Sequence, residues 1–216
     1  MSSVFCLVLL SSAACGGGTS TPEAADLSDK SSTSSEEAPD SLQEEASDQN
    51  TDEEGSSDLK ASLPSRSSGD SAEGDSWTVL VYIMGDTDLE AAALYDLLEL
   101  QEAKLGENAN VVVAVDRSSR TDEENGYTGA EVLGLGNFSD TRLLTFGDGG
   151  LDLVAEGGEL NFGDPSVLAS FIEEGLEAFP ADKTALFLWD HGAGWPGMGP
   201  DETDGYDILT LDEMRD

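Results

Sequence analysis

The segment Thr184-Ala-Leu-Phe-Leu-Trp-Asp-His-Gly-Ala-Gly-Trp195 decides the fold of this chain. Its apolar run, 185–189, ends abruptly in Asp190, His191 and Gly192. Such a run is typical of a parallel strand that is buried on both faces, and the glycines after it indicate a loop at the strand's carboxyl end. Ligands and reacting groups of open α/β sheets gather at that edge. We therefore predict an α/β fold with a mainly parallel sheet, helices on both faces and a candidate site at this loop.

His191 is the single histidine of the sequence. Histidine is the side chain whose ordinary pKa suits proton transfer near neutral pH. Gly192 and Gly194 would let the backbone come close to a ligand. A lone histidine is nevertheless more commonly structural, with its ring bonded to nearby backbone. The residues by themselves leave a catalytic and a structural histidine about equally favoured.

Two further apolar runs, 77–84 and 111–115, predict buried strands. Between them, Thr87 and Glu90 match the T-x-x-E capping box that begins a helix. The apolar residues that follow at helical spacing are Leu89, Ala93, Leu94, Leu97, Leu98 and Leu105. Gly106 is placed to end this helix. The order strand, helix, strand predicts a βαβ unit.

Asp164 as N-cap and Pro165 as first helical residue predict a second helix. Its apolar face comprises Val167, Leu168, Phe171, Ile172, Leu176 and Phe179, and Pro180 follows its end. Short runs at 131–135 and 141–146 predict a peripheral antiparallel hairpin. The glycine-rich stretches 147–150 and 156–158 are interpreted as loops.

A second capping box, Thr210 and Glu213, stands near Asp216, the last printed residue. A helix nucleus of one turn is not stable alone. We therefore expect a domain that is truncated before the last strands of its sheet.

The segment Trp189-Asp-His-Gly-Ala-Gly-Trp195 resembles the W-D-H-G-(S/A)-G-W signature of the clostripain family of cysteine peptidases. Other matching segments, in chain order, are 77–84 with Asp86, Asp88 and Leu89, then 111–117, 161–165, 180–183, 201–203 and 209–213. The resemblance covers about the last two-thirds of the chain. It implies the caspase-like αβα sandwich that caspases, gingipains and legumains share.

The same resemblance implies catalytic roles for two residues. His191 would assist a cysteine thiolate that attacks a peptide carbonyl, and the backbone amide of Gly192 would help to bind the oxyanion. It also implies a polypeptide substrate that is cleaved after Arg or Lys. In the family the nucleophile lies on the strand after the next helix, in a D-A-C-like motif, and this sequence ends before that strand.

Two hypotheses follow. The first is the N-terminal part of a cell-surface clostripain-like cysteine endopeptidase, which is inactive as printed because it lacks the nucleophile. The second is a non-catalytic caspase-fold lipoprotein that serves as a binding or display module. The presence or absence of a D-A-C motif after Asp216 distinguishes them.

The N-terminus carries export signals. An apolar run at 4–10 precedes Ser11-Ser-Ala-Ala-Cys15, which predicts a lipoprotein-type signal peptide at 1–15 with lipidation of Cys15. The alternative is an ordinary cleaved signal with a chance cysteine, because Ser12 stands where a lipobox usually has leucine. Met1-Ser-Ser3 has no Lys or Arg, so a start upstream of Met1 is a further alternative. The lipoprotein prediction implies a bacterial cell envelope location, with a membrane reached through the lipid.

Residues 16–75 are rich in Ser, Asp and Glu and contain no aromatic side chain. Such a segment buries too little apolar surface to offset its ordering entropy, so we predict a disordered acidic tether. Residues 76–216 are then the incomplete peptidase domain. The two cysteines, Cys6 and Cys15, both precede it, so it contains no disulfide framework.

The net charge of the chain is −37. A field of this sign repels phosphate backbones, so we expect no nucleic-acid partner. It favours a cationic partner or simply solubility. The sequence requires no cofactor. A weak Ca²⁺ site in the loop that carries Asp201, Glu202, Asp204 and Asp207 is an alternative to a solvated acidic loop, which we favour.

Overall fold

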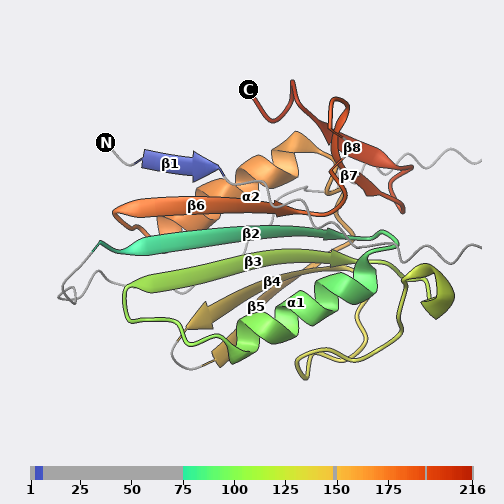
Figure 1. Ribbon diagram of the computed structural model, residues 1–216, viewed down its shortest axis with the longest axis horizontal. Coiled ribbons are helices and arrows are strands. Elements are labelled where there is room, and N and C mark those ends of the chain that lie inside the picture. The colour runs from blue at the N-terminus through green and yellow to red at the C-terminus, as the bar shows by residue number, and fades with distance from the viewer. Residues whose placement is uncertain (1–2, 7–74, 148–149, 193, 216) are drawn as a thin grey trace, which may run out of the picture. The chain divides into compact units, whose positions relative to one another are not determined.

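The computed structural model describes residues 3–6, 75–147, 150–192 and 194–215. Within these ranges the main sheet has the strand order β1-β6-β2-β3-β4-β5 (Figure 1). The strands are β1 (Ser3–Cys6), β2 (Trp77–Gly85), β3 (Ala109–Arg117), β4 (Thr141–Gly147), β5 (Gly150–Gly158) and β6 (Lys183–Trp189). The first four in this order run parallel, and β4 and β5 are antiparallel to their neighbours. The prediction of an α/β fold with a mainly parallel sheet is confirmed.

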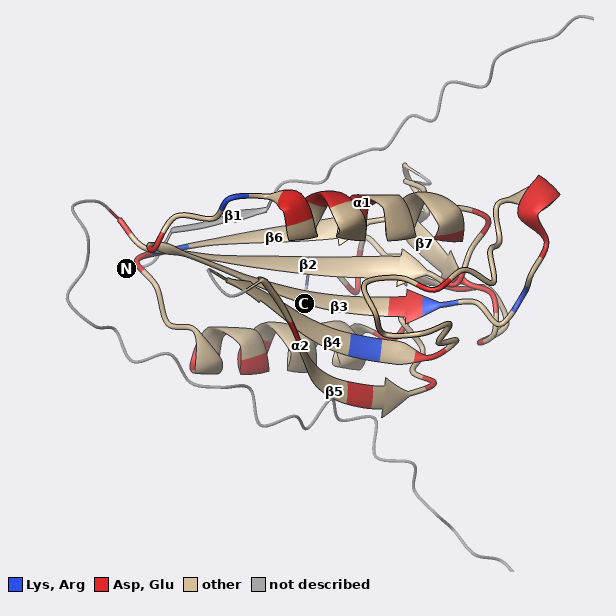
Figure 2. Ribbon diagram, turned by 90° about the horizontal axis from the view of Figure 1, so that it is seen from below, with Lys and Arg blue, Asp and Glu red and all other residues tan. Residues whose placement is uncertain are grey.

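The central strand β2 sets the position of the candidate site. Ile83 of β2 pairs with Val115 of β3 on one side and with Trp189 of β6 on the other. The carboxyl ends of these three strands therefore lie side by side. Residues that follow each of them are brought to one edge, as the strand arrowheads in Figure 2 show.

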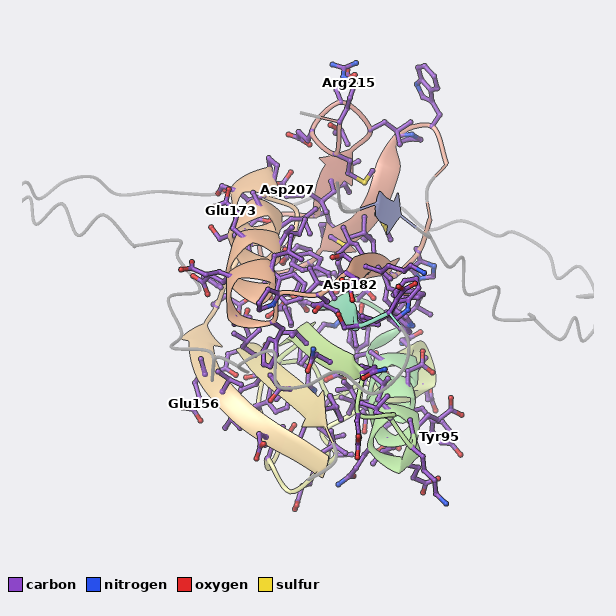
Figure 3. All side chains as sticks on the ribbon, turned by 90° about the vertical axis from the view of Figure 1, so that its left-hand side faces the viewer. Tyr95, Glu156, Glu173, Asp182, Asp207 and Arg215 are labelled. Atoms are coloured by element: carbon purple, nitrogen blue, oxygen red, sulfur yellow. The ribbon has the colours of Figure 1, made fainter. Side chains whose placement is uncertain are left out.

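Helices α1 (Glu90–Glu102) and α2 (Pro165–Ala178) cover opposite faces of the sheet (Figure 2). Alternate strand residues face each helix because side chains alternate along a strand. The cluster under α1 contains Ala93, Leu94, Leu97, Ile83, Val111, Val113 and Val115. The cluster under α2 contains Val167, Leu168, Phe171, Leu80, Tyr82, Val112 and Ala114. Tyr95 and Glu173 project from the outer sides of α1 and α2 (Figure 3).

Of the predicted starts of α1 and α2, the second is confirmed and the first is wrong. Asp164 caps α2, accepting a hydrogen bond from the Ser166 amide at 2.8 Å, as predicted. The capping box at α1 is wrong, because the N-cap is Leu89 with no side-chain cap bond. The Glu90 carboxylate instead binds the buried guanidinium of Arg117. Helix α1 also ends at Glu102, before Gly106.

The peripheral hairpin consists of β4 and β5, so one of its predicted strands is wrong. Residues 131–135 turn instead, with Leu133 and Gly134 at φ of 54° and 74°. This left-handed backbone is incompatible with a strand. Gly150 and residues 156–158, predicted to lie in loops, belong instead to β5 on the outer edge. A second hairpin, β7 (Gly197–Asp201) with β8 (Asp207–Thr210), was not predicted.

The reciprocal contacts of the second capping box are present. The Thr210 amide donates to the Glu213 carboxylate at 2.9 Å, and the Glu213 amide donates to Thr210 Oγ1 at 3.3 Å. They follow strand β8 and enclose a turn at 211–215.

Candidate active site

The loop after β6 holds His191 at the carboxyl edge of the sheet. Trp189, which is 8% exposed, donates from its indole nitrogen to Asp96 Oδ2 at 2.6 Å. The buried Asp190 accepts hydrogen bonds from the His191 amide at 2.5 Å and from Thr87 Oγ1 at 3.3 Å. These contacts turn the chain sharply, and the His191 side chain is 47% exposed. The predicted placement at the rim, rather than inside the protein, is therefore what the structure shows.

Asp190 is an unusual neighbour for this histidine. Burial raises the pKa of its carboxyl group to about 7, although the hydrogen bond from the His191 amide opposes the rise. Its second oxygen, Oδ2, has no hydrogen-bond partner among the described residues. The Asp190 carboxyl group therefore holds the bend after β6 through Oδ1 alone.

Asp88 is the partner of the histidine ring. Its Oδ1 lies 2.7 Å from His191 Nε2, across 103 residues of sequence, and its side chain is 60% exposed. In the neutral tautomer that donates from Nε2 to this carboxylate, Nδ1 is left to accept a hydrogen bond. The sequence placed Asp88 in a family motif but gave no sign of this pairing.

The glycine-rich loop is attached to the β7–β8 hairpin. Gly192 forms an isolated bridge with Met198, and the His191 carbonyl accepts from the Gly199 amide at 3.1 Å. Gly194 adopts a φ of 68°, which favours glycine. Gly192 is exposed beside His191. The hairpin therefore fixes the main chain on which both candidate residues stand.

The acidic loop residues do not form one site among the described residues. Glu202 accepts from Arg120 at 2.8 Å and from the Tyr127 hydroxyl at 2.6 Å. Asp207 accepts from Asn161 at 2.8 Å, while Asp204 is exposed. The Asp201 side chain lies instead in a separate carboxylate cluster, which the sequence did not predict.

That carboxylate cluster consists of Asp86, Asp116, Glu159 and Asp201. One carboxylate oxygen of each residue lies within 4.8 Å of the others, and all but Glu159 are buried. Such a set of oxygen atoms can hold a metal ion. Acidic residues, in red, lie where β2 and β3 end in Figure 2.

The structure describes one of the two cysteines, Cys6, but not Cys15. Cys6 lies on β1, in register with Leu186 of β6. Cys15 and all residues of the predicted tether at 16–75 except Asp75 lie outside the described residues. In the described part of the chain, no helix has the length and apolar character needed to cross a membrane.

Four similarities to known proteins bear on this chain. Clostripain of Hathewaya histolytica is 30% identical over 165 residues, which are 64% of this chain and 30% of that protein. The chain thus spans less than a third of that relative's length. The fold of the present chain also resembles that of a B. fragilis cysteine protease. The sequence identity is 24% and the TM-score is 0.43, and the match covers 56% of this chain and 92% of the other.

A second similar structure is a secreted C11 cysteine protease from Bacteroides thetaiotaomicron in complex with an irreversible peptide inhibitor. It shows 22% identity and a TM-score of 0.49, over 65% of this chain and 38% of that one. The profile described as the clostripain family matches residues 81–216, which include the second half of β2, the carboxylate cluster and the His191 loop. This match extends over more than half of the sequence, and the chain therefore belongs to the clostripain family.

Proposed function

We propose that this chain forms the histidine-bearing part of a cysteine endopeptidase, with His191 as the catalytic histidine. The observation that supports it most is the half-exposed ring at the carboxyl edge of the sheet, whose Nε2 is engaged by Asp88. A structural histidine would be buried, with its ring bonded to backbone. Here the ring faces solvent and keeps one nitrogen available.

The chemistry follows from that arrangement. Nδ1 of His191 accepts the proton of a cysteine thiol, and the thiolate attacks the peptide carbonyl carbon. The imidazolium then returns the proton to the leaving amine, and water hydrolyses the thioester. The amide of Gly192 donates to the oxyanion, and Asp88 acts as a positioning residue for the ring.

The charge near His191 supports a cationic substrate. A polar hollow of about 700 Å³ is lined by Asp88, Glu124, Glu202 and Arg120, among others. Three carboxylates against one guanidinium favour Arg or Lys over acidic side chains. We therefore propose cleavage after Arg or Lys.

The proposed enzyme also requires a nucleophile and an export route. Both cysteines of the printed sequence lie in its first 15 residues, so the nucleophile is assigned to a residue outside that sequence. Residues 1–15, which include β1, act as a signal peptide, Cys15 carries the lipid, and residues 16–75 tether the domain to a bacterial cell envelope. Replacing Cys15 with Ser should move the protein from the membrane fraction to the soluble fraction.

Cleavage of arginyl and glutamyl reporter peptides by the full gene product tests the activity. We expect cleavage of the arginyl peptide alone, its loss after thiol alkylation, and a rate lowered about 10² to 10⁴-fold by His191→Ala. Glu173→Gln, an exposed change on α2, serves as the matched control. Cleavage that survives both alkylation and His191→Ala would contradict the proposal.

The position of the two cysteines also favours a second candidate, a non-catalytic binding or display module. It predicts that the full gene product has no D-A-C motif and cleaves neither reporter. Retained binding of an arginyl peptide by such a protein would support this alternative.

A further inference from the structure

A buried hydroxyl group lies between the two loops that carry Asp88 and His191. Thr87 follows the end of β2, Asp190 follows the end of β6, and each side chain belongs to a residue that is only 1% exposed. Thr87 Oγ1 donates to Asp190 Oδ1 at 3.3 Å, across 103 residues of sequence. The two side chains meet because β2 and β6 are neighbouring parallel strands with aligned carboxyl ends.

The Thr87 hydroxyl also fixes the main chain around Asp88. Its oxygen accepts a hydrogen bond from the Leu89 amide at 3.1 Å, so the hydroxyl closes a turn whose middle residue is Asp88. A hydroxyl has one proton to donate and two lone pairs with which to accept, so Thr87 can make both contacts at once. The turn restricts the backbone of Asp88 and therefore the direction of its carboxylate.

The Asp190 carboxylate fixes the main chain at His191. Its Oδ1 accepts from the His191 amide at 2.5 Å as well as from Thr87. Just before it, the Trp189 indole donates to Asp96 of α1 at 2.6 Å, so the end of β6 is also held to the helix. A single oxygen of Asp190 thus receives both the amide of His191 and the hydroxyl that shapes the turn at residue 88.

The contact between Asp88 and His191 does not by itself hold the two loops together. The two side chains are 60% and 47% exposed, and exposed ion pairs contribute little because water competes for both groups. The hydrogen bond between Thr87 and Asp190 is buried, where water does not compete with it. The 2.7 Å distance from Asp88 Oδ1 to His191 Nε2 therefore depends on the buried contact.

We propose that Thr87 and Asp190 are positioning residues that set the distance between the Asp88 carboxylate and the His191 ring. Each acts through the main chain of the residue that follows it, rather than through the imidazole. Because this role depends on His191 being the catalytic histidine, it extends the proposed function: the hydroxyl of residue 87 becomes a requirement for the full rate.

Carbon-13 relaxation of the His191 ring tests this positioning without any measurement of peptidase activity. The 216-residue chain contains one histidine, so its imidazole Cε1 gives a single signal. Thr87→Val replaces the hydroxyl with a methyl group, and it should lower the order parameter of the ring, as Asp88→Ala should. Thr87→Ser keeps the hydroxyl and should keep the wild-type value. Thr78→Val is the matched control, because Thr78 is a buried threonine at the other end of β2 whose hydroxyl donates to the Phe179 carbonyl.

Asp190→Leu removes the acceptor of the same hydrogen bond and should also lower the order parameter of the ring. It provides a second test if Thr87→Val does not fold, which the melting temperature of each variant shows. A ring that stays as ordered as in the wild type in either folded variant would overturn the proposal. An equal loss of order in Thr78→Val would overturn it too, since the effect would then follow from lost stability alone.

Kinetics of the full gene product with an arginyl reporter peptide connect the positioning to the reaction. Thr87→Val should lower kcat about 10- to 100-fold and leave KM nearly unchanged, because a misplaced ring slows the chemical step without weakening substrate binding. Thr87→Ser should retain most of kcat, and Thr78→Val should match the wild type. If His191→Ala abolishes cleavage but Thr87→Val leaves kcat unchanged, the positioning role is wrong. If His191→Ala leaves cleavage unchanged, the proposed function is wrong, and the ring relaxation still tests the buried contact.

Discussion

The guanidinium of Arg117 lies 2.8 Å from the carboxylate of Glu90, and neither side chain is exposed to solvent. Glu90 also accepts a hydrogen bond from the Thr128 amide at 2.6 Å, and Arg117 donates to the Thr128 carbonyl at 3.0 Å. The pair thus ties the first turn of α1 to the end of β3 and to the polar segment that follows it. It is held on the face of the sheet opposite to the carboxylate cluster.

Glu90→Ala should lower the free energy of unfolding by about 3–5 kcal/mol, because the Arg117 charge would be left buried without its partner. Urea unfolding measures this loss. Glu102→Ala, at the exposed end of the same helix, should change stability by no more than about 0.5 kcal/mol. Replacing both partners, with Glu90→Leu and Arg117→Met, should recover most of the loss. A small effect of Glu90→Ala would show that the pair contributes little.

Asp190 should make stability depend on pH. Its pKa is about 7 when folded, against about 3.9 in an unfolded chain, so the folded state binds more protons between these values. This contribution to stability is complete below pH 4 and is lost as the pH rises to 7. From pH 5 to pH 8 the wild type should lose on the order of 2 kcal/mol relative to Asp190→Asn. Melting temperatures of both proteins at the two pH values measure it, and a constant difference would contradict it.

Asp88 should affect catalysis more than stability. The Asp88 and His191 side chains are 60% and 47% exposed, so Asp88→Asn should cost less than about 1 kcal/mol of stability. In the full gene product the same change should lower kcat while leaving KM nearly unchanged, because the neutral asparagine amide orients the ring less firmly than the charged carboxylate does. Asp88→Glu should restore part of the rate. An equal loss of kcat in Asp88→Asn and Asp88→Glu would show that the pairing does not position the ring.

The sequence predicts those parts of the fold that depend on local pattern. The strands β2, β3 and β6 have largely apolar sequences because they lie inside the sheet between other strands, and α2 has a local N-cap. Strand β5 was missed because it lies at the edge, where pairing with β4 rather than burial stabilises it. The capping box at α1 failed because Glu90 is drawn to Arg117, 27 residues away.

The candidate site also contains residues that the sequence predicts and residues that it does not. His191 was found because a strand, a titratable residue and two glycines are adjacent in sequence. The pairing with Asp88 spans 103 residues and arises only from the β2–β6 register. The carboxylate cluster joins four elements, and one of them, β7, contains the glycines and proline that usually indicate a loop.

Gly197 is the residue on which the β7–β8 hairpin depends most directly. It adopts a φ of 138°, and a Cβ there would lie 2.0 Å from the Leu209 carbonyl oxygen, so Gly197→Ala forces the two strands apart. Gly205 has a φ of 76° with open space around it, so Gly205→Ala costs only the backbone strain of about 1–2 kcal/mol. Gly197→Ala should therefore destabilise the protein more in urea and should also speed proteolysis within 196–210. Equal proteolysis of the two variants would mean that the hairpin tolerates the separation.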